Sequence, residues 1–471
     1  MKNLWSKNEL ILATNGLDPS LNFLKKTDGV FGISIDDRTI KKGDLFIALK
    51  GNKFDGHEFI KSAMSKGAAG LIVSDTKLAK KYGALLVKNT SDALIRIGKF
   101  ARDRFEGITI ALTGSSGKTS TNHILSSSLK KYGPTHNTQG NNNNIIGVSL
   151  TLSRLPSSFK YCVLELGMNN PGEIKRLTKI VKPDIALITN VSNSHFQNFK
   201  NEEEIAHAKS EIFLGLKKNG VAILNSDNAW CDFLLNKAKK LGINTHLFGY
   251  SKKSDTKIIK VTDDKKGTKV YFDNKIKLHL NYLNTTQAIN AIATISIVKQ
   301  LKLNLEKTFK AISNIEPLPG RGQIIKINFN QDHKTFVIDD SYNANPDSMR
   351  AALSNFYSLK TKFKNYQTIL IIGDMLELGR ISKKSHKELI PVIKKINPHI
   401  LITLGHYTNY LCKELSPSVN CNPYYSIEIL LEDIKKILKP RQLILIKGSN
   451  GTGLWKLVPF FKNCLEEHNA A

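Results

Sequence analysis

The residues with the clearest chemical potential in this chain form a short glycine-containing loop at 113–119, Thr-Gly-Ser-Ser-Gly-Lys-Thr. An apolar, β-branched run at 108–112 precedes the loop, and a helical pattern at 120–131 follows it. A strand, a glycine loop and a helix in this order form a phosphate cradle, because backbone N–H groups and the helix N-terminus face the ligand. In such a loop Lys118 supplies charge to the β- and γ-phosphates, and the Thr119 hydroxyl can hold Mg²⁺. The sequence therefore predicts ATP binding.

The loop is shorter than the common G-x-x-x-x-G-K-[ST] pattern. The residue five positions before Gly117 is Leu112, where that pattern has glycine. The alternative interpretation is a glycine-rich turn without chemical consequence, which the strand–helix context disfavours.

Three more residues could take part in chemistry beside this loop. Glu165 ends an apolar run, so its carboxylate is expected at a strand end, where a hard cation on the phosphates would find an oxygen ligand. His195 follows another such run, although a lone histidine is more often structural. Lys209 lies in an amphipathic helical pattern, and spacing alone predicts a solvated lysine.

The elements that must position these residues are expected to form an α/β protein. At 471 residues the chain is long enough for about three domains. We expect a first α/β unit at 1–90, a central unit at 91–316 and a C-terminal unit at 317–471, the last after a Pro/Gly-rich linker. Short apolar runs alternate with helices, which predicts mainly parallel sheets with ligands beyond the carboxyl ends of the strands.

Short apolar runs predict the strands of these units, and one longer segment predicts a helix. Strands are expected at 43–49, 70–73, 161–167, 185–190, 221–225, 335–339, 368–373, 400–405 and 443–447, with a helix at 59–66. A polar loop at 50–57 suits ligand contact or a plain surface turn.

Composition limits the class of protein. Hydrophobic residues make up 41% of the chain, and the 5 cysteines form no C-x-x-C pair, which disfavours a disulfide framework or a zinc site. The first residues lack the apolar core of a signal peptide, and no run approaches the ~18 apolar residues of a membrane span. We therefore expect a cytoplasmic protein without membrane insertion. The net charge of +29 is spread over the whole chain, so we expect polyanionic small substrates and no nucleic acid.

Several segments resemble the Mur ligases, the ATP-dependent amide-forming enzymes of peptidoglycan synthesis. The resemblance lies in 113–119, 165–167, 190–195 and 208–211, and the family uses the shortened loop. Further stretches resemble most closely the members that join D-alanyl-D-alanine to UDP-N-acetylmuramoyl-tripeptide: 36–38, 43–57, 140–144, 165–174, 339–346 and 373–379.

This resemblance implies a fold, a reaction and cofactors. The fold would have a UDP-binding domain, a central P-loop domain and a C-terminal Rossmann-like domain. The reaction would join D-alanyl-D-alanine to the tripeptide carboxylate through an acyl phosphate, releasing ADP and phosphate, in the cytoplasmic stage of peptidoglycan synthesis. The implied cofactors are ATP, two Mg²⁺ ions and a CO₂-derived carbamate on Lys209, and a monomer is expected.

The resemblance also implies roles for individual residues. Catalytic roles fall to Lys118, Lys209, His195 and Glu165, and metal ligation to Thr119, Glu165, His195 and carbamylated Lys209. The implied ATP-binding residues are Thr113, Gly114, Ser115, Ser116, Gly117, Lys118, Thr119, Ser120, Asn284, Arg321, Asp340, Tyr342 and Asn343. The implied substrate-binding residues are Ser34, Asp36, Arg38, Lys50, Gly51, Asp55, Asn141, Asn143, Asn144, Lys447 and Ser449. Around Asn284 the family has H-N-x-x-N, but Leu283 and Gln287 replace its histidine and second asparagine.

Two alternatives remain open from the sequence. Another Mur-type ligase would add a different amino acid or act on folate, but the D-N-P-R stretch of the diamino-acid-adding members is absent. A basic P-loop ATPase that binds nucleic acid would show ATP turnover stimulated by DNA or RNA, and no aromatic-interleaved basic motif supports it.

Overall fold

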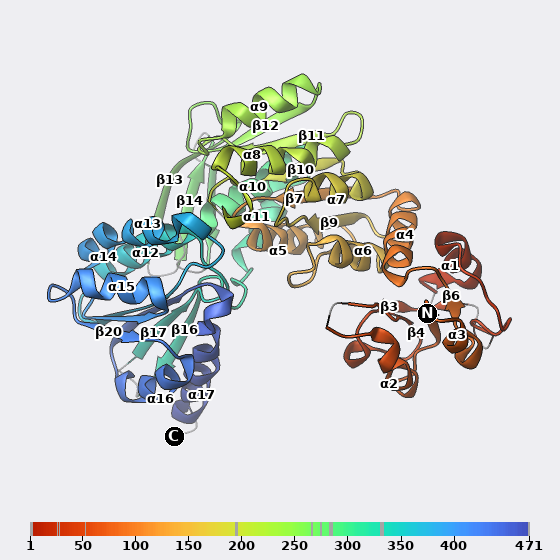
Figure 1. Ribbon diagram of the computed structural model, residues 1–471. Helices are drawn as coiled ribbons and strands as arrows, with labels where there is room; N and C mark the ends of the chain where they lie inside the picture. Colours follow the sequence, from red (N-terminus) through yellow and green to blue (C-terminus); the bar gives the residue numbers. More distant parts are fainter. Residues whose placement is uncertain are drawn as a thin grey trace.

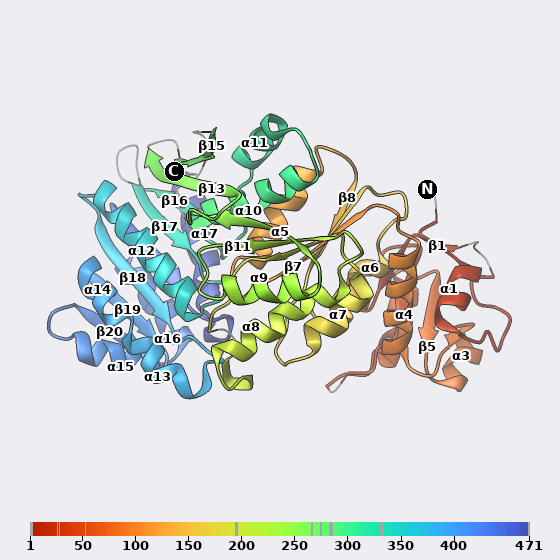
Figure 2. The same cartoon turned by 90° about the horizontal axis from the view of Figure 1, so that it is seen from above.

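A computed structural model describes residues 3–25, 27, 29–51, 53–193, 196–264, 267–273, 276–281, 286–329 and 334–469. Sheets of four, nine and six strands follow one another along the chain, and helices cover them (Figure 1). The central unit lies between the first and the third units, as Figure 1 and Figure 2 show from two directions. None of the helices in the described ranges has both the length and the apolar character needed to cross a membrane.

The first unit is built on four parallel strands: β3 (Gly32–Ser34), β4 (Asp44–Ile47), β5 (Gly70–Val73) and β6 (Leu85–Leu86). Its other elements are β1 (Trp5–Ser6), α1 (Lys7–Thr14), β2 (Gly29–Val30), η1 (Asp37–Thr39), η2 (Gly56–Phe59), α2 (Ile60–Ser65) and α3 (Thr76–Tyr82). The helix α4 (Thr90–Asp103) leads to the central unit. The buried Trp5 indole donates a hydrogen bond to the Ser153 carbonyl at 2.7 Å, which ties the two units together.

The central unit has nine strands in the order β15-β14-β13-β12-β11-β10-β7-β9-β8. They are β7 (Ile108–Thr113), β8 (Thr135–Asn137), β9 (Tyr161–Glu165), β10 (Ile185–Ile188), β11 (Val221–Asn225), β12 (Asn244–Gly249), β13 (Thr256–Asp264), β14 (Gly267–Phe272) and β15 (Ile276–Leu280). Strands β7 to β13 pair in parallel, as expected. The expectation of a wholly strand–helix pattern missed β14 and β15, which are antiparallel. β14 begins three residues after β13 ends, too soon for a crossover helix.

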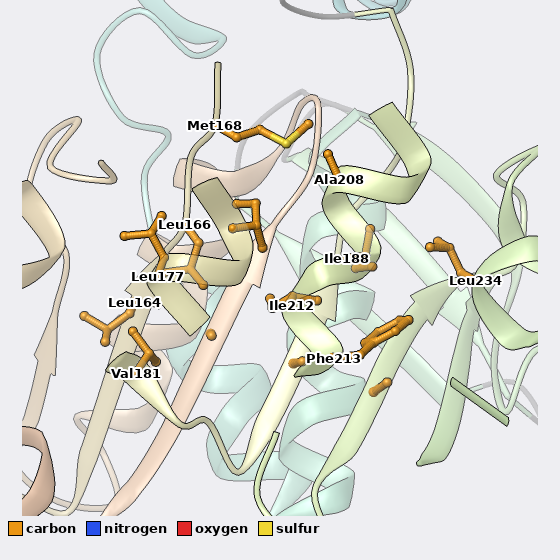
Figure 3. Packing of buried hydrophobic residues seen from close by; sticks show 14 of the residues in the cluster. Leu164, Leu166, Met168, Leu177, Val181, Ile188, Ala208, Ile212, Phe213 and Leu234 are labelled. Atoms are coloured by element: carbon orange, nitrogen blue, oxygen red, sulfur yellow. The ribbon is translucent and has the colours of Figure 1, made fainter. Parts of the chain in front are cut away.

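Helices cover both faces of the central sheet, and each face has its own apolar core. They are α5 (Lys118–Leu129), α6 (Ile145–Ser153), α7 (Glu173–Val181), α8 (Glu202–Ser210), α9 (Cys231–Lys240), α10 (Thr286–Gln300) and α11 (Leu305–Ser313), with the short helices η3 (Phe196–Asn198) and η4 (Glu211–Gly215). One core joins Leu164, Leu177 and Ile212 (Figure 3), and the other joins Leu112 and Ile292. Burial on both faces explains why these strands are continuous apolar runs.

The third unit has six strands in the order β16-β17-β21-β18-β19-β20, of which only the β16–β17 pair is antiparallel. The strands are β16 (Gln323–Asn328), β17 (Lys334–Asp339), β18 (Gln367–Gly373), β19 (Ile400–Leu404), β20 (Cys421–Tyr424) and β21 (Gln442–Lys447). The helices are α12 (Pro346–Lys362), η5 (Gly379–Ile381), α13 (Ser382–Lys387), α14 (Ile390–Ile396), α15 (His406–Leu415), α16 (Ile427–Ile437), η6 (Asn450–Thr452), η7 (Leu454–Lys456) and α17 (Leu457–Asn469). The α/β class and the mainly parallel sheets are confirmed.

Candidate active site

The phosphate-type loop lies between β7 and α5, as the sequence predicts. Gly114 and Gly117 have φ values of +154° and +80°. A Cβ at Gly114 would lie 1.9 Å from the Thr189 hydroxyl, so only glycine lets the loop approach β10 this closely. Leu112 is fully buried inside β7, which explains why no glycine stands there. The helix begins at Lys118, two residues earlier than the pattern predicts, so the motif's lysine and threonine belong to its first turn.

Asn190, just beyond β10, holds the loop in shape. Its side-chain oxygen accepts from the Ser116 N–H at 2.8 Å, and its backbone oxygen accepts from the Ser115 N–H at 3.0 Å. The Lys118 ammonium folds back and donates to the Gly114 carbonyl at 2.6 Å. Burial lowers the pKa of Lys118, and the nearby Glu165 carboxylate opposes this shift. The loop is thus pre-formed, with a partly buried cation at its centre.

Glu165 lies at the end of β9, beside the first turn of α5. Its side chain is almost fully buried, with 2% of its surface exposed. The Thr119 hydroxyl donates to its Oε2 at 2.9 Å, and the Asn143 amide donates to its Oε1 at 2.9 Å. A threonine hydroxyl and a carboxylate are ligands that Mg²⁺ prefers, so this pair fits a cation bound to phosphate.

Lys209 is buried, and the prediction of a solvated lysine from spacing alone is wrong. Only 2% of the residue is exposed, although α8 has the composition of a surface helix. Its amine has no hydrogen bond or ion pair to any residue that the structure describes, and it lines the same cavity as Lys118 and Glu165. Burial, and then the positive charge of Lys118, hold the pKa of Lys209 well below its ordinary value. A neutral amine is the form that adds CO₂, so the residue fits a carbamate.

Two predicted residues, His195 and Asn284, lie outside the described residues, as does Leu283. Within the described ranges, no three His, Cys, Asp or Glu side chains gather into a metal site.

The third unit brings a cation to the phosphate loop. Arg321 donates to the Thr119 hydroxyl at 3.0 Å, and its guanidinium lies 4.1 Å from the centre of the Tyr342 ring. The Asn345 amide donates to the Ser115 carbonyl at 3.3 Å. These contacts place the third unit directly on the loop that the central unit supplies.

Two other predicted residues of the third unit support their neighbours. Lys447 forms an ion pair with Asp340 at 2.8 Å and donates to the Asn343 carbonyl at 3.1 Å. Burial raises the pKa of Asp340, and the charge of Lys447 opposes that shift. The Ser449 hydroxyl accepts from the Leu376 N–H at 2.8 Å. These contacts hold together the loops at the carboxyl edge of the third sheet.

One cavity of about 960 Å³ collects most of the predicted residues. Its lining includes Ser115, Ser116, Gly117, Lys118, Thr119, Ser120, Asn141, Asn143, Glu165, Lys209, Arg321, Asp340, Tyr342, Asn343, Lys447 and Ser449. Thr113 and Gly114 lie behind this lining. The Asn144 side chain instead caps α6, accepting from the Gly147 N–H at 2.9 Å.

The predicted residues of the first unit are not part of this cavity. Arg38 forms an ion pair with Asp36 at 2.7 Å, and the Ser34 hydroxyl donates to the Asp36 carbonyl. The backbones of Lys50 and Asp55 form an isolated antiparallel β-bridge across the polar loop that contains Gly51, and Asp55 contacts the His57 ring at 2.6 Å. These groups form a separate cluster after the carboxyl ends of β3 and β4.

Among the cavity-lining residues to which the sequence reasoning gave no role are Asp227, Tyr250 and Asn290, and Gln287, which replaces the family's second asparagine, lines the cavity as well. Asp227 and Tyr250 follow the ends of β11 and β12, so the rule that ligands sit beyond strand ends could have found them. Asn290 accepts from the Thr121 hydroxyl at 3.2 Å and donates to Gln287 at 2.9 Å. If the H-N-x-x-N pattern is placed three residues later, at 286–290, its last asparagine is Asn290. The structure places Asn290 beside the loop.

A second cavity, of about 1130 Å³, lies against α8 and contains none of the predicted residues. Ala208 and Ser210 line it, whereas Lys209 between them lines the central cavity. The chemistry therefore identifies the smaller cavity as the candidate active site.

Comparison with known families gives three matches along the chain. The Mur ligase family catalytic domain matches residues 30–97, the Mur ligase middle domain matches 112–298, and the Mur ligase glutamate ligase domain matches 320–450.

Individual proteins match over nearly the whole length. A UDP-N-acetylmuramoyl-tripeptide–D-alanyl-D-alanine ligase of Rickettsia prowazekii is 36% identical over 435 residues, which cover 91% of this chain and 95% of that protein. A crystal structure of MurF from Acinetobacter baumannii superposes with a TM-score of 0.81 at 28% identity, covering 97% of this chain and 98% of that one. The MurF ligase of Thermotoga maritima in complex with ADP superposes with a TM-score of 0.77 at 26% identity, covering 93% and 98%.

Proposed function

This chain belongs to the Mur ligase family, and from that premise we propose that it joins D-alanyl-D-alanine to UDP-N-acetylmuramoyl-tripeptide at the expense of ATP. One observation carries the proposal: Thr119, Glu165 and Lys209 line one cavity with a phosphate loop of the family's form. The curated relative named for this reaction is 36% identical over 91% of the chain, which supports the choice of substrates.

The proposed reaction has two steps. A carboxylate oxygen of the tripeptide attacks the γ-phosphorus of ATP, the bond to ADP breaks, and an acyl phosphate forms. The dipeptide amine then attacks the acyl carbon, an amide C–N bond forms, the C–O bond to phosphate breaks, and the amine loses a proton. Phosphorylation is needed because a carboxylate oxygen is a poor leaving group.

The loop would bind the phosphates of ATP. The first N–H groups of α5 have no partner within the helix and face the cavity, and Lys118 provides the charge that two approaching anions require. Tyr250, after β12, and Asn290, on α10 beside the loop, both line the cavity and are our candidates for the walls around the base.

Thr119, Glu165 and Lys209 as a carbamate would hold Mg²⁺, together with His195. The donor set is suitable because a carbamate replaces a buried amine, which has no described partner, by an oxygen ligand. Mg²⁺ bound there would neutralise phosphate charge in the transition state.

The third unit would close the site. Arg321 and Asn345 contact the phosphate loop, so their unit covers the reacting groups and excludes water that would hydrolyse the acyl phosphate. Lys447 and Ser449 hold the loops at the carboxyl edge of the third sheet, and we propose that the dipeptide binds beside these two residues.

We propose three domains, 1–90, 91–316 and 317–471, with the UDP moiety on the first. Ser34, Asp36, Arg38 and the 50–57 loop present polar groups after β3 and β4, which supports a nucleotide-binding role for that cluster. We propose that the protein acts as a monomer. ATP and a UDP-linked substrate favour action in the cytoplasm.

Release of phosphate tests the proposal. We expect release from ATP only when UDP-N-acetylmuramoyl-tripeptide and D-alanyl-D-alanine are both present, with a pentapeptide product of matching mass. Glutamate, meso-diaminopimelate and L-lysine serve as rival acceptors. Turnover that requires one of these, or that DNA stimulates without either substrate, would refute the proposed reaction.

A further inference from the structure

Asn143 contacts the candidate metal ligand Glu165 directly. It lies in the loop at 140–144, between β8 and α6, and its amide donates to Glu165 Oε1 at 2.9 Å. The resemblance to the family implies a substrate-binding role for Asn143, but this hydrogen bond uses one of its two amide protons on a protein group.

The Glu165 carboxylate is fixed at both oxygens. Asn143 contacts Oε1, and the Thr119 hydroxyl contacts Oε2 at 2.9 Å. The backbone of Glu165 is also held, because its N–H donates to the Thr138 hydroxyl at 3.0 Å. A carboxylate with both oxygens bound cannot rotate freely, so its direction toward the cavity is set before any ligand arrives.

Asn143 is itself held by Gly167, two residues beyond Glu165. The Gly167 N–H donates to the Asn143 carbonyl at 2.9 Å. A Cβ on Gly167 would lie 2.6 Å from Cγ of the Asn143 side chain. Glycine at this position therefore allows the amide to lie against β9, within reach of the carboxylate.

We propose that Asn143 is a positioning residue that orients the Glu165 carboxylate for the metal ion on the nucleotide, and that Gly167 is required for its placement. The inference rests on the proposed role of Glu165 as a metal ligand. It predicts that removal of the amide weakens metal binding while the nucleotide itself still binds.

The experiment measures Mn²⁺ binding to the ADP-loaded full chain, by the electron paramagnetic resonance signal of free Mn²⁺. Asn143→Ala is expected to raise the Kd for Mn²⁺ about 10- to 100-fold, the range for removing a partner of a metal ligand. ADP affinity in EDTA and the melting temperature are expected to stay near the wild-type values. Asn142→Ala is the matched control, because its side chain belongs to the same loop but does not line the cavity.

Gly167→Ala provides an independent variant that leaves Asn143 chemically intact. The added methyl would displace the amide, so this variant is expected to weaken Mn²⁺ binding in the same direction as Asn143→Ala. If both variants weaken Mn²⁺ binding, the effect is due to the position of the Asn143 amide.

The proposal is overturned if Asn143→Ala leaves the Kd for Mn²⁺ unchanged and alters only the KM for the UDP substrate. It is also overturned if Asn142→Ala causes an equal loss, or if ADP affinity in EDTA falls in parallel. Because Mn²⁺ binding needs neither ligase substrate, weakened binding without ligation would refute the proposed reaction and leave the positioning role intact.

Discussion

The central cavity and the polar cluster of the first unit both carry predicted ligand-binding residues, but their residues are held in different ways. Arg321 contacts Thr119 across 202 residues of chain, and Asn345 contacts Ser115 across 230. In the first unit, Arg38 contacts Asp36 across only two residues. The contacts of Arg321 and Asn345 thus depend on the packing of whole units, whereas the contact between Arg38 and Asp36 depends on a local turn.

Burial follows the same division. Glu165 and Lys209 are each only 2% exposed, whereas the Arg38 side chain is 82% exposed. Charges in a buried site act strongly on reacting groups because water does not screen them, and exposed charges act weakly. We therefore expect substitutions of the charged residues in the central cavity to affect the rate, and substitutions in the first unit to affect substrate affinity.

The largest effect is expected for Lys118→Ala. Without the partly buried cation of the loop, transition-state charge on the phosphates loses a main stabilising group, and kcat should fall about 10³-fold. Steady-state phosphate release measures this at saturating ATP. Lys131→Ala, an exposed lysine just after the same helix, should stay within about twofold of wild type. A kcat for Lys118→Ala within tenfold of the wild-type value would contradict the expectation that this cavity determines the rate.

Lys209→Met is expected to lose activity about 10²-fold, because the metal would lose an oxygen ligand. For Lys209→Ala, which leaves room in the cavity, formate or acetate should restore part of the activity by supplying a carboxylate. Full activity of either variant without additives would remove Lys209 from the mechanism.

Lys209→Met is also expected to stabilise the ligand-free fold in CO₂-free buffer by about 1–3 kcal/mol, since a buried amine without a described partner is replaced by an apolar chain. The pKa of Lys209 is well below its ordinary value in the fold, so the unfolded chain binds more protons between those two pKa values. Wild-type stability should therefore rise with pH across that window, and the advantage of the methionine variant should shrink toward pH 10.5. Denaturant titrations at several pH values measure the unfolding free energy of both proteins. A difference between Lys209→Met and wild type that does not change with pH would contradict the prediction.

The same comparison shows how much the sequence could predict. The strand–loop–helix around Lys118 and the position of Glu165 at a strand end were predictable, because both depend on local pattern. The burial of Lys209 was not, because α8 has the composition of a surface helix, and the exposure of Lys209 depends on how that helix packs against its neighbours. Only resemblance to a family gave that lysine a role.

Contacts between residues distant in the chain were also beyond prediction from pattern. No local signal pairs Arg321 with Thr119, or Asn143 with Glu165, since these depend on how loops from separate strands meet. The antiparallel strands β14 and β15 were missed because the region was assumed to continue the strand–helix alternation. Asn290 was missed because the family pattern was considered in one register only, the one that includes Asn284.

A smaller effect is expected for Asn345, which links the two units of the central cavity. Its side chain caps α12 by accepting from the Ser348 N–H at 2.8 Å and also donates to the Ser115 carbonyl. Asn345→Ser should keep the cap but not the second contact, and the KM for ATP should rise about 2- to 10-fold, as loss of one neutral hydrogen bond predicts.

Asn345→Ala should show the same KM and, in addition, a loss of about 1 kcal/mol in unfolding free energy, because the cap is gone. Kinetics and denaturant titrations on both variants separate the two roles. If Asn345→Ser binds ATP as wild type does, the contact with Ser115 has no part in closure.

The smallest effect is expected for Arg38 in the first unit, where the cluster is local and exposed. Arg38→Ala should raise the KM for the UDP substrate about threefold and leave kcat unchanged, because an exposed charge contributes little and Asp36 already shares it. The melting temperature should not change measurably, since this exposed ion pair joins two residues of one turn. Arg38→Lys keeps the charge but not the two-pronged contact with Asp36, so an intermediate KM would assign the effect to geometry. A large fall in kcat for Arg38→Ala would mean that this exposed cluster moves onto the reacting groups, and the division between a rate-determining cavity and an affinity-determining surface would fail.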